Sequence, residues 1–316
     1  MTLQIPFKPA KNKPFDVVGL GANSVDWLCL LPTFPKFDSK LPLREMHRLG
    51  GGEVATALTV CSRFGLRSKY IGKVGNDSNG AFSRLDLQAE GLDVTSLAQA
   101  DCRNQFAIIL VDEENGERTV LSHRPLEIFF KDQELRRSDI CSGRLLHIDG
   151  NDQRAALRAA QWAREDGIPV TIDIDRVDRP YTAELIQAVD FLIVSENFAS
   201  DYLGIADFEA AIRKLSGQVQ GFLCCTLGAK GSLVVHDSEL LRFPAYPISA
   251  MDTTGAGDVF RGAFIYALFQ HWSLEQTLRF ANAVAGLSCE RLGARGGIPR
   301  MDEVRSFMAK NTEVRR

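Results

Sequence analysis

Short apolar runs alternate with amphipathic segments along most of this chain. The runs end in glycine or in polar residues, as buried strands often do, and they lie at 17–21, 70–75, 144–149, 168–174, 191–194 and 222–228. Segments with apolar residues at helical spacing lie at 53–64, 78–90, 152–166 and 256–270. Because strands and helices alternate, the pattern predicts a mostly parallel sheet with helices on both faces, which is a doubly wound α/β fold.

Two stretches interrupt this alternation, residues 27–49 and residues 101–124. The first is rich in proline, and the second has two apolar-alternating runs on either side of the turn-like string ENGE at 114–117, which predicts a β-hairpin. We expect both inserts to form a small β subdomain at the edge of the sheet. It could close over a site as a lid, and its strands could equally pair two copies of the chain into a homodimer.

The composition indicates a protein that handles small molecules. The net charge is −3 and the basic residues are scattered, so the chain lacks the positive field that nucleic-acid binding requires. No apolar run reaches the ~18 residues of a membrane span, and the N-terminal residues have no signal-peptide core. The seven cysteines include no C-x-x-C pair, which indicates reduced thiols. We therefore expect a cytoplasmic protein without a membrane or nucleic-acid partner.

The string DTTGAGDVFRGA at 252–263 leads from polar turn-forming residues through two glycines into an apolar helix. The backbone N–H groups of Gly255, Ala256 and Gly257 would lack partners within that helix. Together with the helix dipole they would form a pocket for an anion such as a phosphoryl group. Asp258 follows in the first helical turn and could accept a proton from an attacking hydroxyl.

A plainer interpretation is that Asp252 and Thr253 cap this helix and that Asp258 only complements its dipole. Taken together, however, the string D-T-T-G-A-G-D resembles the C-terminal signature of the ribokinase-like (PfkB) family of carbohydrate kinases. The resemblance covers almost the whole chain and implies one ribokinase-like α/β domain over residues 1–316. It also implies an enzyme that phosphorylates a hydroxyl of a small-molecule sugar with ATP.

The N-terminal half carries a second part of the resemblance. GGGEVATALTVCSRFG at 50–65 is similar to the Gly-Gly segment before the family's first long helix, and implies that the backbone of Gly51 and Gly52 closely approaches the sugar. Asp26 stands where the family's aspartate binds sugar hydroxyls. Thr56 stands where many members have a sugar-binding asparagine, so the acceptor of ribokinase itself cannot be transferred to this chain.

On the nucleotide side, the string TLGAKGSLVV at 226–235 resembles the family's strand, loop and strand beside ATP. This resemblance implies that Thr226, Gly228 and Gly231 contact the nucleotide, although a plain hairpin turn would use the same residues. Asn282 falls in the helix that borders the adenine in family members.

The metal-binding part of the resemblance is altered. Many members have an N-x-x-E motif that orients the hydration shell of Mg²⁺, and this chain has SENF from Ser195 onwards, without the usual glutamate. The resemblance places Ser195 beside the nucleotide and leaves Glu196 as a neighbouring carboxylate for Mg²⁺. It also implies a site for a monovalent cation such as K⁺ at Asp252, Thr254 and the loop 293–297, although a structural turn would use the same residues.

Longer strings refine the expected acceptor. GGGEVATA, MDTTGAGDVFRGA and RLGARGGIP resemble sulfofructose kinases, whereas ENGERTVLS and VSENFASDYLG resemble ketohexokinases. Both resemblances imply a ketose or a ketose derivative. Arg124 lies beside the expected lid and could bind an anionic substituent of the acceptor, or it could belong to a solvated surface.

Single features of the sequence suggest three functions other than a sugar kinase. GLGANS at 19–24 suggests a dinucleotide site, but its third glycine is missing and no helix follows it. A nucleoside kinase on the same fold would need an aromatic side chain to stack on the base, for which Phe106 and Phe34 are candidates. A sugar-binding regulator without activity is suggested by the altered metal motif, and the complete anion loop with Asp258 argues against it.

Overall fold

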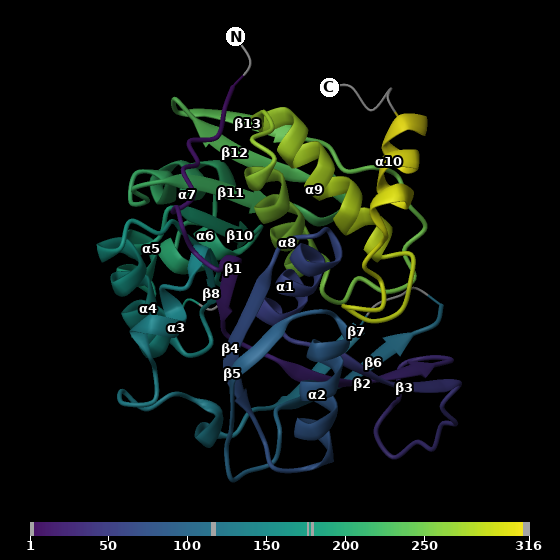
Figure 1. Ribbon diagram of the computed structural model, residues 1–316. Helices are drawn as coiled ribbons and strands as arrows, with labels where there is room; N and C mark the ends of the chain where they lie inside the picture. The colour runs from purple at the N-terminus through teal and green to yellow at the C-terminus, as the bar shows by residue number, and fades with distance from the viewer. Residues whose placement is uncertain (1–2, 115–117, 176, 178–179, 312–316) are drawn as a thin grey trace.

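The computed structural model describes residues 3–114, 118–175, 177 and 180–311. The strands of its larger sheet are β1 (Phe15–Leu20), β4 (Ser68–Val74), β5 (Asp93–Gln99), β8 (Gly143–Asp149), β9 (Val170–Asp173), β10 (Phe191–Ser195), β11 (Phe222–Thr226), β12 (Ser232–His236) and β13 (Glu239–Phe243). Within the described residues this sheet has the order β13-β12-β11-β10-β9-β8-β1-β4-β5 (Figure 1). Pairs from β5 to β11 are parallel, and β12 and β13 are antiparallel additions.

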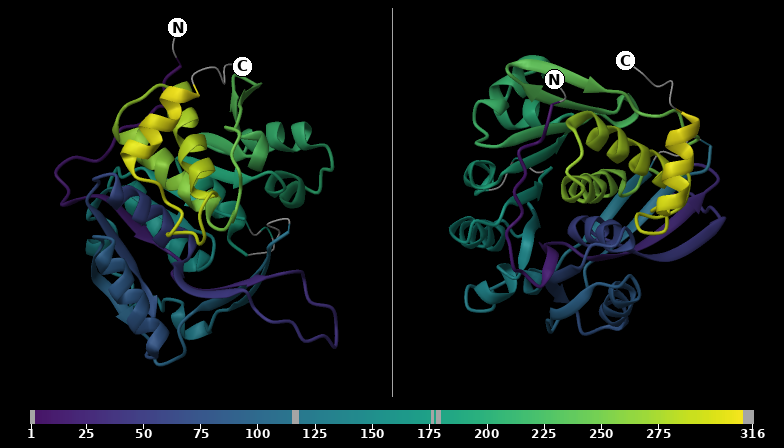
Figure 2. Two further views of the ribbon diagram at one scale, coloured as in Figure 1. Left: turned by 90° about the vertical axis from the view of Figure 1, so that its right-hand side faces the viewer. Right: turned by 45° about the horizontal axis from the view of Figure 1, so that its top comes forward.

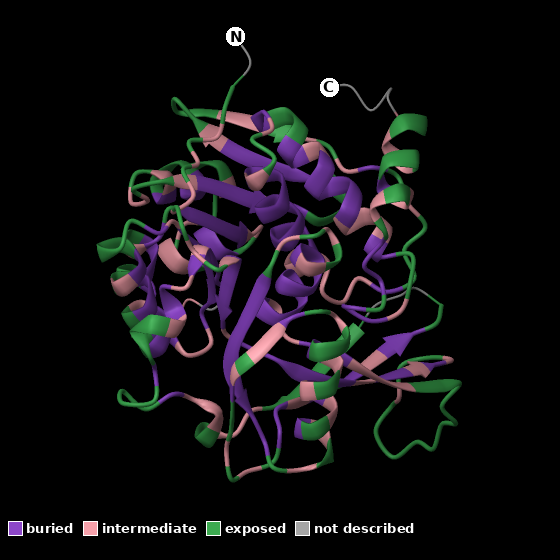
Figure 3. Ribbon diagram, viewed as in Figure 1, coloured by how far each residue is buried: buried purple, intermediate pink, exposed green. Residues whose placement is uncertain are grey.

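Helices cover both faces of this sheet. They are α1 (Glu53–Arg63), α2 (Ser78–Ala89), α3 (Arg137–Ile140), α4 (Gln153–Glu165), α5 (Thr182–Ala188), α6 (Phe198–Leu203), α7 (Phe208–Ser216), α8 (Ala256–Phe269), α9 (Leu274–Ser288) and α10 (Met301–Lys310). Because successive strand residues face opposite sides, Val17 joins the core under α1, α8 and α9, whereas Val18 joins the core under α3 to α7. Figure 3 shows the central strands between these layers as mostly buried, whereas the edge strands β5 and β13 are mostly intermediate or exposed. The doubly wound α/β fold predicted from the sequence is confirmed.

The two inserts assemble into a second sheet beside the first. Its strands are β2 (Ser24–Leu31), β3 (Glu45–Gly51), β6 (Phe106–Asp112) and β7 (Arg118–His123), and among the described residues their order is β3-β2-β6-β7. The predicted hairpin is confirmed by antiparallel pairing of β6 with β7, and residues 115–117 of its turn lie outside the described residues. Figure 2 shows this sheet projecting from the body of the molecule. Pairing of two copies through this sheet stays a prediction.

Helices α1 and α8 pack directly against each other beside the sheet (Figure 1). The contact needs a glycine at Gly262, because a Cβ atom there would lie 2.5 Å from the carbonyl oxygen of Ala57. Each helix also begins at a glycine with positive φ, Gly52 at 95° and Gly255 at 75°, and neither has a side-chain cap. The first N–H groups of both helices are therefore free of side-chain caps.

Among the described residues, none of the helices has both the length and the apolar character needed to cross a membrane.

Candidate active site

The loop before α8 has the geometry of an anion site. Gly255 is left-handed, the N–H of Ala256 donates to the carbonyl oxygen of Thr253 at 3.3 Å, and α8 closes its first turn from Val259 to Gly255 at 2.9 Å. Within the described part of the chain, the N–H groups of Gly255 and Gly257 meet no backbone acceptor. They are available to an anion at the positive end of the helix dipole.

The interpretation of Asp252 and Thr253 as helix caps is wrong, because neither side chain bonds to the start of α8. Instead, Asp252 accepts from the N–H of Thr254 at 2.9 Å and from the N–H of Gly293 at 2.8 Å. The sequence also predicted the N–H of Ala256 as part of the anion pocket, and in the structure this N–H donates to the carbonyl oxygen of Thr253 within the loop. The Asp252 carboxylate thus fixes the loop rather than the helix.

Asp258 lies half-buried in the first turn of α8, beside the anion loop. Burial raises the pKa of its carboxyl to about 7, and the negative charge of Glu53 raises it further, whereas the Arg261 guanidinium opposes this shift. The carboxyl of Asp173 lies within hydrogen-bonding reach of Asp258. A carboxyl with this pKa can exchange a proton near neutral pH.

A buried ion pair between Arg261 and Asp173 lies next to the Asp258 carboxyl. Arg261 and Asp173 are each 3% exposed, and the Arg261 Nη2 lies 2.8 Å from Asp173 Oδ1 and donates to the carbonyl oxygen of Ile193 at 2.9 Å. A Cβ atom on Gly257 would lie 2.8 Å from Arg261 Nη1, so this glycine makes room for the guanidinium as well as for an anion. Sequence reasoning missed Arg261, although it stands in the string DTTGAGDVFRGA.

The predicted sugar-binding residues meet at the junction of β2, β3 and α1. Asp26 is 7% exposed and accepts from the Ser24 hydroxyl at 2.7 Å, and burial raises the pKa of its carboxyl to about 6. A Cβ atom on Gly51 would lie 1.9 Å from Asp26 Oδ2, and one on Gly52 would lie 2.7 Å from the carbonyl oxygen of Ala22. Glycine is therefore required at both positions by close approach of the neighbouring chain.

Thr56 and Arg124 lie differently from Asp26. Thr56 is completely buried in α1, and its hydroxyl has no hydrogen-bond partner among the described residues. Arg124 follows β7 and donates from Nη1 to the side-chain oxygen of Asn151. At the opposite end of β7, Arg118 donates to the hydroxyl of Thr253 in the anion loop. Strand β7 thus extends from the anion loop to the carboxyl end of β8.

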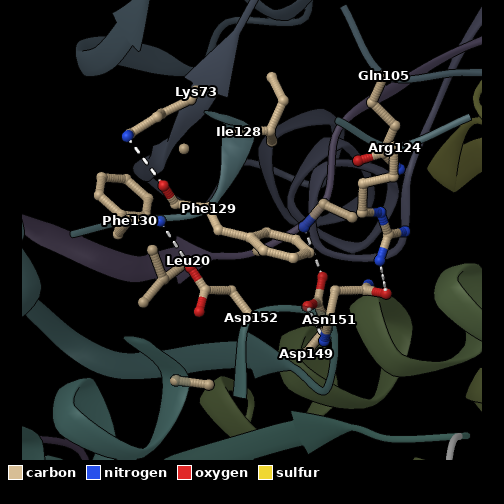
Figure 4. A pocket seen from close by; sticks show the side chains of 14 residues that line it. Leu20, Lys73, Gln105, Arg124, Ile128, Phe129, Phe130, Asp149, Asn151 and Asp152 are labelled. Atoms are coloured by element: carbon tan, nitrogen blue, oxygen red, sulfur yellow. Dashed lines mark hydrogen bonds between the residues drawn. The ribbon is translucent and has the colours of Figure 1, made fainter. Parts of the chain in front are cut away.

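A cavity of about 30 Å³ lies beside Arg124, at the carboxyl ends of β1, β4 and β8 (Figure 4). Its polar lining comes from Lys73, Gln105, Arg124, Asp149, Asn151 and Asp152, and its apolar lining includes Leu20, Ile128, Phe129 and Phe130. Asp149 accepts from the N–H of Ala22 at 2.5 Å, which places the cavity next to the Gly52 backbone. Parallel α/β sheets bind ligands at this edge.

The candidate base-stacking residues from the sequence lie elsewhere. Phe106 packs on His123 with 5.2 Å between ring centroids, and Phe34 is 47% exposed. Neither lines the cavity of Figure 4, where Phe129 is the aromatic side chain that points into the space between Ile128 and Asp149.

A larger pocket of about 590 Å³ lies on the other side of the anion loop. It brings together four predicted nucleotide contacts with two residues of the anion loop: Thr226, Gly228, Gly231, Asn282, Ala256 and Gly257. Its apolar lining includes Tyr246, Pro247, Ile248, Phe260, Ala285 and Cys289. This size and mixture of groups suit a ligand with a flat apolar part and an anionic part.

The remaining predicted nucleotide and metal residues lie at the rim. Ser195 ends β10 beside Thr226 but does not line the pocket. The Asn282 amide donates to the carbonyl oxygens of Phe243 at 3.0 Å and Pro244 at 3.3 Å, so it also holds the pocket wall together. Glu196 pairs with Lys230 at 2.8 Å on the surface. Among the residues that the structure describes, no cluster of three His, Cys, Asp or Glu side chains could hold a metal.

Glu53 and Asp149 are site residues that the sequence reasoning did not single out. The negative charge of Glu53 raises the pKa of the carboxyl groups of Asp26, Asp149 and Asp258. Both residues carried a usable signal, since Glu53 follows the Gly-Gly pair and Asp149 ends a buried parallel strand.

Comparison with known proteins agrees with this geometry. The family described as "pfkB family carbohydrate kinase" matches residues 17–301. A nucleoside kinase of Methanothermobacter thermautotrophicus is 28% identical over 93% of this chain and 96% of its own length. An ATP-dependent ribose-1-phosphate kinase of Halopiger xanaduensis is 26% identical over 92% of this chain and 98% of its own. The crystal structure of ribokinase from Thermotoga maritima superposes with a TM-score of 0.79 at 24% identity, covering 93% of this chain and 99% of that one. This chain belongs to the pfkB family of carbohydrate kinases.

Proposed function

We propose that this kinase transfers the γ-phosphoryl group of ATP to a hydroxyl of a ketose or a ketose derivative. The observation that carries the proposal is the position of Asp258. Its carboxyl, with a pKa raised to about 7, stands beside an anion loop that borders the 590 Å³ pocket. The negative charge of Glu53, which follows the sugar-side glycines in the chain, also acts on this carboxyl. The ketose class rests on the resemblance of the strings around Gly51 and Asp258 to sulfofructose kinases and ketohexokinases.

The mechanism follows from these positions. ATP lies in the 590 Å³ pocket with its γ-phosphate at the N–H groups of Gly255 and Gly257, and the sugar is held by Asp26 and the backbone of Gly51. The sugar hydroxyl attacks phosphorus as the bond to the β-phosphate oxygen breaks, and its proton passes to Asp258. Positioning and charge stabilisation supply most of the rate in such transfers.

Two cations would assist. When bound, Mg²⁺ would neutralise charge on the phosphates, and Glu196 is the carboxylate predicted to assist it. The ion pair of Glu196 with Lys230 lies at the surface and is weak enough to exchange. For K⁺, the Thr254 hydroxyl is buried without a partner among the described residues and lies next to the Asp252 carboxylate. Oxygen donors of this kind suit a hard cation.

The function is tested by ADP release from Mg-ATP across ketoses, sulfosugars, phosphosugars, aldoses and nucleosides, with and without K⁺. Turnover greatest with a ketose or a ketose derivative supports the proposal. Turnover with another class retains the kinase and replaces the acceptor. No turnover, with a sugar that still raises the melting temperature, would support the non-catalytic sugar-binding regulator.

The pH dependence of this reaction should follow Asp258. The base must be ionised, so kcat/KM is expected to fall about ten-fold per pH unit below the carboxyl's pKa of about 7 and to level off above it. The folded chain also keeps the proton that the unfolded chain loses above its ordinary pKa. The Asp258 contribution to stability therefore decreases as pH rises towards 7. A pH–rate profile between about pH 5.5 and 8.5 measures the change in kcat/KM, and a flat profile would contradict the assignment of Asp258 as the base.

A nucleoside kinase is the second candidate, because the nucleoside kinase of Methanothermobacter thermautotrophicus is 28% identical over 93% of this chain. The base would lie beside Phe129, Gln105, Arg124 and Asn151, and these side chains must move to admit it, because the cavity of about 30 Å³ that they line holds little more than a water molecule (Figure 4). A Phe129→Ala variant separates the candidates. It should raise KM for a nucleoside by about ten-fold or more through lost stacking, and affect a simple ketose much less.

A further inference from the structure

Arg295 is buried between parts of the chain that are far apart in sequence. It is 3% exposed, and its Nη2 donates to the carbonyl oxygen of Gly51 at 2.6 Å and to Asn23 Oδ1 at 2.8 Å. Its Nη1 forms an ion pair with the carboxylate of Asp86 on α2. One guanidinium therefore connects the β3–α1 junction, the segment after β1, and α2.

The surrounding backbone is shaped to admit this side chain. A Cβ atom on Gly50 would lie 2.6 Å from Arg295 Nη1 and 2.2 Å from Asp86 Oδ2. On the loop that carries Arg295, Gly293 has a φ of 80°, and a Cβ atom there would lie 2.3 Å from a methyl carbon of Leu49. Glycines on both sides of the contact thus let the loop and β3 approach closely enough for the guanidinium to reach Gly51.

We infer that Arg295 is a positioning residue for the acceptor, which fixes the Gly51 carbonyl and thereby the Gly51–Gly52 backbone and the place of Asp26. The inference rests on the proposed function, because it assigns the sugar to this backbone. A lysine could not replace Arg295, because a single ammonium group cannot bond to Gly51, Asn23 and Asp86 in the geometry of the planar guanidinium. In support, the positive charge of Arg295 lowers the pKa of Asp26 against the effect of burial.

The loop that carries Arg295 also contacts the nucleotide side of the site, but through Gly293 and Ala294 rather than through the Arg295 side chain. Gly293 donates its N–H to Asp252 at 2.8 Å, and a Cβ atom on Gly255 would lie 2.4 Å from the Ala294 Cβ. On the side of the loop these contacts use only the Gly293 backbone and the Ala294 methyl group, so they do not depend on the Arg295 side chain. The two halves of the site can therefore be perturbed separately.

The test compares KM values for the acceptor and for ATP in Arg295→Lys. We expect KM for the acceptor to rise about ten-fold or more, because small misplacements of binding groups cost up to about 100-fold, while KM for ATP stays within about three-fold. The matched control is Arg291→Lys, which changes an arginine that pairs with Glu303 at the surface. It should leave both constants unchanged.

An equal rise of both KM values, or an unchanged KM for the acceptor, would overturn the inference. If Arg295→Lys does not fold, Asp86→Asn removes the charge that anchors the guanidinium while keeping the bonds to Gly51 and Asn23. It is then expected to raise the acceptor KM alone by about two- to five-fold. If the unchanged chain turns over no acceptor, that result counts against the proposed function only. Calorimetry with a sugar that raises the melting temperature would then compare its affinity for the unchanged chain and for Arg295→Lys, and so decide the role of Arg295.

Discussion

Asp258→Asn is expected to lower kcat by about three orders of magnitude while the chain still folds and binds ATP, because an amide cannot accept the proton of the attacking hydroxyl. The substitution preserves shape and removes the ionisable group. Stopped-flow or coupled ADP-release kinetics measure the loss, and calorimetry measures ATP affinity. KM for ATP should change by less than about three-fold, since the anion loop is untouched.

The matched control is Asp201→Asn. Asp201 also lies in the first turn of a helix, α6, but it is exposed and lines neither the 30 Å³ cavity nor the 590 Å³ pocket. Its substitution should leave kcat unchanged. If Asp258→Asn retained turnover within about ten-fold of the unchanged enzyme, proton acceptance would have to be assigned to another group or to water.

Arg261→Met is expected to lower the free energy of unfolding by about 3–5 kcal/mol, because it leaves Asp173 buried without its counter-charge. Arg261 and Asp173 are each 3% exposed and 2.8 Å apart, so solvent screens their interaction little. Urea denaturation at constant pH measures the change. Turnover near neutral pH should fall as well. The Arg261 guanidinium lowers the pKa of Asp258, so its loss raises that pKa and leaves less of the base ionised.

The reason for this loss is tested by adding Asp173→Leu to Arg261→Met. The double variant removes both charges and should recover part of the stability, since an apolar pair avoids the cost of burying ions. Arg279→Met serves as the control, because Arg279 makes an i,i+4 pair with the exposed Glu275 and should cost less than about 1 kcal/mol. If Arg261→Met lowered the free energy of unfolding by less than about 1 kcal/mol, Asp173 would have to be protonated in the folded chain.

The sequence predicted the features whose signals are local. The strand and helix alternation, the hairpin of β6 and β7, and the glycine loops at Gly51 and Gly255 all followed from short strings. Strand β5 was missed, since most of its residues are only partly buried or exposed and give no apolar run. Arg295 was missed for a different reason, because Gly51 lies 244 positions away and nothing near either residue marks the contact.

The direct contact of α1 with α8 gives the two sides of this site a common support. Gly262 lets the helices touch at Ala57, so the starts of both helices are aligned by the hydrophobic core rather than by flexible loops. The small sheet supplies Asp26 and adjoins Arg124, and among the described residues it hydrogen-bonds to the anion loop only through Arg118. Substitutions in the small sheet away from Arg118 and Gly51 are therefore expected to change which acceptor binds while the starts of the two helices keep their alignment.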